Sequence, residues 1–211
     1  MNIYYNAEYT GAHEDAKLIS MGFIAEDGSR LYLEFSDIPV YSVNSYIEEN
    51  VFPDTYLYDR SYNGIEKATS AGAADLGDDY CIVTRSTAIL VITQWFQEVL
   101  SGRPEGETIQ LVSYCSHYDA SLLYNLFQGY LPLYLNAICY DIVGLVMHYT
   151  TDWKIDLPLS ARLRDTLRDS RMEELATDLG HPISNYSKNH ALRHAEIIRN
   201  VYEGLKEFGK Y

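Results

Sequence analysis

Residues 3–9 read Ile3-Tyr4-Tyr5-Asn6-Ala7-Glu8-Tyr9 and form the most informative stretch of this chain. Their apolar and aromatic character predicts a β-strand over residues 2–9. Because side chains alternate along a strand, Asn6 and Glu8 point to the same face. Two acids spaced in this way can chelate a divalent cation, since hard cations prefer several oxygen ligands. Here the first position is an amide, and the pair alone indicates only two solvated polar residues.

The rest of the chain predicts one α/β domain over residues 1–211. A second strand is expected over 17–25, and the Asp27-Gly28 turn signal leads into a return strand over 30–35. Residues 54–86 show no clear period and are interpreted as an insertion or long loop. The remaining periodicity predicts a strand over 108–114 and helices over 45–51, 87–100, 116–129, 140–148, 171–179 and 189–208. Strands first, followed by alternating helices and strands, are typical of the α/β class.

Composition limits the partners. The net charge of −14 opposes binding of long nucleic acid through its phosphates, but allows a short RNA, a small nucleotide or a protein partner. The 20 tyrosines can stack on bases or anchor an interface. No apolar run reaches the length of a membrane span, and residues 2–4 look like a strand rather than a signal peptide. Cys81, Cys115 and Cys139 fit reduced thiols, so a cytoplasmic location is expected.

Several segments carry a resemblance to a known family. After Glu8 the chain continues Tyr9-Thr10-Gly11 and then Lys17-Leu18-Ile19-Ser20-Met21-Gly22-Phe23-Ile24-Ala25-Glu26-Asp27-Gly28. This sequence is similar to the start of the RNase AS-like exoribonucleases, a branch of the DEDDh 3′–5′ exonucleases. Residues 45–53, Tyr118-Asp119 and residues 189–195 resemble later segments of the same family. The resemblance implies an RNase H-like mixed sheet flanked by helices, and a homodimer.

The resemblance also implies a metal centre, which this sequence alters. In the family, four carboxylates hold two Mg²⁺ or Mn²⁺ ions, and a histidine acts as general base. By position, the four carboxylates fall on Asn6, Glu8, Asp119 and His194, and the base falls on Asn189. Only Glu8 and Asp119 are acids here, so a weakened metal site is expected at these four positions, with weak or no hydrolysis.

A histidine pair offers a different metal site. His190 and His194 are four residues apart and would share one face of a helix. With Glu8 and Asp119 opposite, they would suit Zn²⁺ better than Mg²⁺. The alternative is a histidine at the helix start and another that fills the altered pocket. His190 is also one position, about 100° of helix, from Asn189, so it could replace the base only if the helix start were rotated.

Three hypotheses of function remain open from the sequence. The first is an exoribonuclease-like protein that binds a nucleotide or RNA 3′ end through an eroded site. The second is an active metal-dependent 3′–5′ exonuclease seen as a catalytic-site variant, whose natural form has carboxylates at positions 6 and 194. The third is a non-catalytic protein that binds another protein, or sequesters a small nucleotide, on the same fold.

Overall fold

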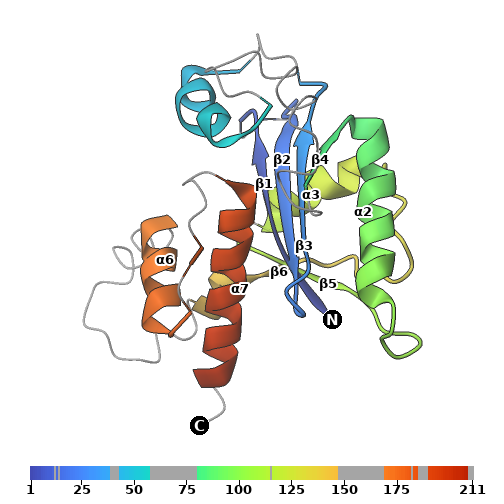
Figure 1. Ribbon diagram of the computed structural model, residues 1–211, viewed down its shortest axis with the longest axis vertical. Coiled ribbons are helices and arrows are strands. Elements are labelled where there is room, and N and C mark those ends of the chain that lie inside the picture. The colour runs from blue at the N-terminus through green and yellow to red at the C-terminus, as the bar shows by residue number, and fades with distance from the viewer. Residues whose placement is uncertain are drawn as a thin grey trace.

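The computed structural model describes residues 1–11, 13, 15–38, 43–57, 80–114, 116–146, 169–181, 183–184 and 190–208. Within these residues, a six-stranded mixed sheet has the order β4-β3-β2-β1-β5-β6 (Figure 1). β1 pairs antiparallel with β2 and parallel with β5, β2 pairs antiparallel with β3, and the outer pairs β3–β4 and β5–β6 are parallel. The strands are β1 (Asn2–Tyr9), β2 (Leu18–Ala25), β3 (Arg30–Phe35), β4 (Tyr80–Val83), β5 (Gln110–Ser113) and β6 (Tyr140–Asp141).

Helices cover both faces of the sheet. α2 (Arg85–Leu100) and α3 (Ser116–Leu126) lie on one face, and α7 (Ala191–Phe208) lies on the other (Figure 1). α6 (Asp169–Asp178) packs against the outer side of α7. A short π-helical segment, η2 (Ile47–Val51), runs into a 3₁₀ turn, η3 (Phe52–Asp54). The architecture is a mixed α/β sheet flanked by helices, as expected for an RNase H-like fold.

Alternation along β1 decides which side chains face which helix. Ile3, Tyr5 and Ala7 belong to the apolar core between the sheet and α2. Tyr4 belongs to the core on the opposite face, which contains residues of α6 and α7. Asn6 and Glu8 have the parity of Tyr4, so β1 directs them to the α7 face. The strand that forms because of its apolar residues therefore also orients the two polar ones.

Gly22 allows the start of α7 to lie directly on the sheet. It pairs with Asn6 across β1 and β2. A Cβ atom at Gly22 would lie only 2.4 Å from the backbone nitrogen of Leu192 and 2.5 Å from the carbonyl carbon of Ala191. Only glycine leaves room for a helix backbone at this distance. This close approach places the first turns of α7 beside Asn6.

Most of the expected elements are confirmed, with two corrections. The strands over 2–9 and 30–35 have the expected bounds. The helix expected over 140–148 is wrong at its start, because Tyr140–Asp141 forms the edge strand β6. Residues 142–146 are helical, and residues 147–148 lie outside the described residues. Strand β4 was not expected; it lies inside the segment 54–86, of which residues 58–79 are outside the described residues. No helix in the described ranges is long and apolar enough to cross a membrane.

Candidate functional site

Three of the expected site residues meet in one hydrogen-bonded triangle. Glu8 Oε1 lies 3.1 Å from Asn6 Nδ2 and 3.0 Å from His194 Nδ1. The two nitrogens are themselves 3.3 Å apart. Asn6 and Glu8 come from β1, and His194 comes from the end of the first turn of α7. The contacts therefore join residues that are 186 and 188 positions apart in the chain. The sheet and the helix start, held together at Gly22, therefore assemble this group.

The chemistry of Glu8 assigns the hydrogen atoms in the triangle. An ionised carboxylate only accepts, so the Asn6 amide N–H and the His194 Nδ1–H both donate to Oε1. The opposite tautomer would place an unprotonated imidazole nitrogen against a carboxylate oxygen at 3.0 Å, which is repulsive. The assignment also turns the amide nitrogen of Asn6, rather than its carbonyl oxygen, toward Glu8. Side chains of Glu8 and His194 retain 17% and 14% of their exposure, so the site is largely shielded from water.

Asp119 is the second acid and comes from the first turn of α3. It is only 2% exposed, and the hydroxyl of Ser113 donates a 2.5 Å hydrogen bond to its Oδ2. Burial raises the pKa of Asp119 to about 7; the Ser113 hydrogen bond opposes this rise, and the charge of Glu8 adds to it. Two acids in one site thus have different environments, because Glu8 accepts two hydrogen bonds and Asp119 is enclosed. No sequence pattern indicates the contact between Asp119 and Ser113.

His190 occupies a different environment from His194. It directly precedes α7, and its Nδ1 accepts a 3.3 Å hydrogen bond from the backbone N–H of Leu192. The ring stacks on Tyr32, with 4.1 Å between centroids, and only 5% of the residue is exposed. Burial lowers the pKa of His190 to about 4, so the ring is neutral near pH 7. These contacts give His190 a structural role at the helix start, and Asn189 lies outside the described residues.

A buried carboxylate on β3 organises the aromatic surroundings of His190. Glu34 is fully buried and accepts hydrogen bonds from the backbone N–H groups of Tyr56 and Leu57, at 2.8 and 2.7 Å. The hydroxyls of Tyr32 and Tyr80 donate to the same carboxylate. Burial raises the pKa of Glu34, and the four donors oppose that rise. Glu34 thus ties the segment after η3 to the sheet beside the site. The sequence signal for this role is an acid two residues after Tyr32, between the apolar residues Leu33 and Phe35.

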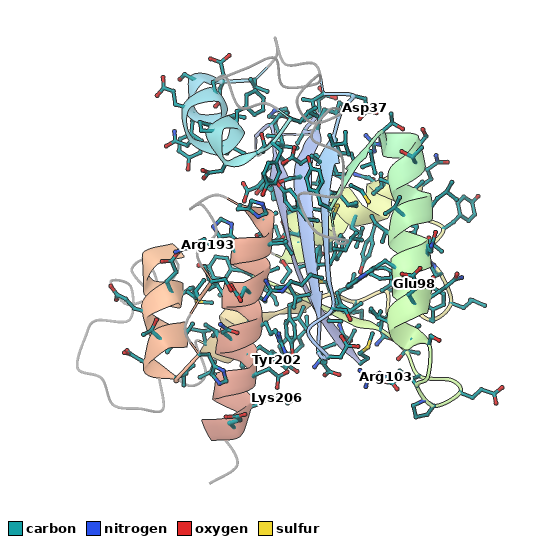
Figure 2. All side chains as sticks on the ribbon, viewed as in Figure 1. Asp37, Glu98, Arg103, Arg193, Tyr202 and Lys206 are labelled. Atoms are coloured by element: carbon teal, nitrogen blue, oxygen red, sulfur yellow. The ribbon has the colours of Figure 1, made fainter. Side chains whose placement is uncertain are left out.

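A small cavity lies beside His194. Its volume is about 30 Å³, enough for about one water molecule. A larger hollow of about 440 Å³ lies between the β2–β3 turn and the end of α2, near Arg103 and Glu98 (Figure 2). That hollow is remote from the start of α7, where Arg193 is labelled. The residues that line the small cavity are Asn6, Tyr114, Met172, His194, Ile197 and Ile198.

The arrangement does not fit the metal centre that the resemblance implies. Among the residues that the structure describes, no group of three or more His, Cys, Asp or Glu side chains is placed to hold a metal ion. The amide N–H of Asn6 and the Nδ1–H of His194 both point at Glu8 Oε1, so a cation at that oxygen would have to replace them. The zinc alternative also finds no support, because His190 and His194 are not placed with Glu8 and Asp119 as a metal-holding group among the described residues. Three of the four expected ligand positions, Asn6, Glu8 and His194, come together as a hydrogen-bonded group.

Comparison with known proteins supports the fold. The chain matches no protein-family model and no curated protein sequence. Among solved structures, it is similar to a 3′-exonuclease in a structure that describes recognition of the 3′ end of a histone mRNA stem-loop. The TM-score is 0.54 and the identity 11%, over 98% of this chain and 81% of that chain. The second structure is the nuclease domain of 3′hExo, a DEDDh family member bound to rAMP. It has 9% identity over 99% of this chain and 91% of that chain, and its TM-score of 0.48 is too low to carry an argument. The likeness establishes the fold of a 3′-exonuclease domain.

Proposed function

We propose that this protein is an exonuclease-like protein of the RNase AS type that binds a short RNA 3′ end or a nucleotide and hydrolyses it weakly or not at all. The observation that carries the proposal is the Asn6–Glu8–His194 triangle, which brings together three of the four positions that the resemblance assigns to metal ligands. Asp119 completes the group on the α3 side. Divalent-metal chemistry normally activates the nucleophile in such sites and needs several oxygen ligands. The proposed loss of activity follows from the exchange of two acids for Asn6 and His194.

The charge of the chain favours a small ligand. A long RNA would bring many phosphates toward a protein of net charge −14, with few cations to neutralise them. A terminal nucleotide or an oligonucleotide of a few residues presents less charge. We therefore propose that the ligand enters end-first at Glu8.

Equilibrium binding tests the proposal. Fluorescence anisotropy with a 5′-labelled oligoadenylate should give saturable binding. Glu8→Ala should weaken this binding at least tenfold, because hydrogen bonds to a charged group contribute about 1.5–3 kcal/mol. Lys206→Ala is the matched control, since Lys206 lies at the far end of α7 (Figure 2), and it should leave the affinity unchanged. Equal affinities for all three proteins would refute binding at this site.

We also propose that the protein forms a homodimer through the segment between α3 and β6. Residues 120–140 contain no charged side chain, although the chain as a whole is strongly acidic. Tyr130, Leu133 and Ile138 on this segment are 85%, 101% and 80% exposed. Two copies of a polyanion repel each other, so contact is most favourable where charge is absent. This exposed apolar segment supports pairing with a second copy.

A further inference from the structure

We propose that the hollow between the β2–β3 turn and the end of α2 binds a small zwitterion, such as a free α-amino acid with an apolar side chain. This hollow is separate from the site at Glu8, so the inference goes beyond the proposed function. Its volume of about 440 Å³ lies within the range of small-molecule sites, about 300–1,000 Å³. Three segments line it, namely residues 27–30, the last turns of α2 and residues 101–103.

The base of the hollow is apolar and firmly held. Trp95 and Val99 are four residues apart and therefore lie on the same side of α2. Only 9% and 7% of these two residues are exposed, because both also belong to the main core, where the ring of Trp95 packs on Phe23 at 6.0 Å between centroids. An apolar group of a ligand would cover what remains exposed and remove it from water.

Opposite charges stand on different segments around this base. Glu98 lies on α2, and Arg103 follows the helix (Figure 2). With Asp27 and Arg30 they give the hollow two acids and two cations, so its side chains sum to zero although the chain carries −14. A ligand that carries one charge of each sign can pair with both kinds of side chain. A ligand of a single sign would meet repulsion from one kind.

Arg103 is the partner that we assign to a ligand carboxylate. Its Nη2 lies 3.7 Å from Asp27 Oδ2, which makes an ion pair that is too long for a hydrogen bond. Asp27 Oδ1 accepts a hydrogen bond from the backbone N–H of Ser29 at 2.9 Å. A ligand carboxylate could form two short, parallel hydrogen bonds with the planar guanidinium, which the pair with Asp27 does not provide.

Glu98 is the partner that we assign to a ligand ammonium group. Gln94 Nε2 donates to Glu98 Oε1 at 2.9 Å and so orients the carboxylate along the helix. An ionised carboxylate has about four lone-pair sites, so it can also accept from an ammonium group. The other cation of the hollow, Arg30, pairs with Glu196 of α7 at 3.2 Å, which leaves Arg103 and Glu98 as the two charges for the ligand.

Three matched ligands test the proposal on the wild-type protein. L-leucine carries both charges, N-acetyl-L-leucine lacks the ammonium group and L-leucinamide lacks the carboxylate. NMR titration should show saturable binding of L-leucine that is at least tenfold tighter than binding of either analogue, because each analogue loses one charge-assisted contact. If L-leucine does not bind, or if all three ligands bind equally, the proposal is overturned.

Two substitutions assign the contacts. Arg103→Gln should weaken L-leucine binding at least tenfold and make L-leucine and L-leucinamide bind alike, since the partner of the carboxylate is gone. Glu98→Gln should likewise make L-leucine and N-acetyl-L-leucine bind alike. Glu105→Gln is the matched control, because Glu105 is exposed in the same loop as Arg103 but does not line the hollow, and it should leave the affinity unchanged.

The variants also separate this inference from the proposed function. Melting temperatures close to that of the wild-type protein show that the variants fold. Oligoadenylate binding at Glu8 should be the same in Arg103→Gln, Glu98→Gln and the wild-type protein. Undiminished L-leucine binding by both Arg103→Gln and Glu98→Gln would overturn the assignment of the hollow and leave the proposed function standing.

Discussion

Gly22→Ala is the substitution that most directly tests how the site is assembled. The added Cβ would lie 2.4 Å from Leu192 N, 2.5 Å from Ala191 C and 2.7 Å from Leu192 Cα. Ordinary contacts between such atoms are about 3.5 Å, so the start of α7 must move away from β2 by about 1 Å. All three atoms are helix backbone, which cannot yield by changing a rotamer. Overpacking of this kind costs about 1–3 kcal/mol.

The same movement should separate His194 from Glu8. Their hydrogen bond is 3.0 Å long, and a displacement of about 1 Å would bring it outside the range of a good hydrogen bond. Urea unfolding should therefore show a loss of about 1–3 kcal/mol, together with weaker oligoadenylate binding. Gly144→Ala is the matched control: it lies in the helical residues 142–146, nothing would lie within 4 Å of its Cβ, and it should be neutral or slightly stabilising. A loss below about 0.5 kcal/mol for Gly22→Ala would refute the proposed packing of α7 on β2.

Three further substitutions test other parts of the account. Asp119→Asn should flatten the pH dependence of the free energy of unfolding. Burial raises the pKa of Asp119 and so favours its protonated form, which means that the wild-type protein loses stability as pH rises from about 4 to about 7. The free energies of urea unfolding at pH 5 and pH 8 should therefore differ less in the variant than in the wild-type protein. Glu34→Gln should lower the free energy of unfolding by about 1–3 kcal/mol, because an amide cannot accept at both oxygens; an unchanged urea midpoint would contradict the role given to Glu34. Leu133→Asp should convert a dimer to a monomer in light scattering after size exclusion, and a wild-type monomer would rule out the proposed pairing.

The sequence predicts the local parts of this fold well. Apolar alternation sets the bounds of β1 and β3, because both strands are continuous and strongly patterned. Strand β4 escaped prediction because four residues, Tyr80–Val83, become a strand only by pairing with β3 from a distant part of the chain. The same applies to β6, where two residues pair with β5 and interrupt an apparent helical pattern.

The candidate site likewise has one part that the sequence predicts and another part that only the fold shows. The shared face of Asn6 and Glu8 follows from strand geometry alone, and the resemblance supplied the positions of Asp119 and His194. The hydrogen bonds that define the site join β1 to α7 across more than 180 residues, which no local pattern contains. The burial that raises the pKa of Asp119 likewise depends on packing around α3. Pairing partners and burial are tertiary properties, so they emerge only with the fold.

The central claim of the proposed function is that the site at Glu8 holds an RNA 3′ end and does not cut it. The most direct test incubates a 5′-labelled oligoadenylate with the protein and Mn²⁺ and follows the length of the product on a denaturing gel. The account predicts no shortening by the wild-type protein, and stepwise shortening from the 3′ end by Asn6→Asp/Asn189→His/His194→Asp. Stepwise shortening by the wild-type protein, abolished in Glu8→Ala, would contradict the account and make His194 part of a working active site.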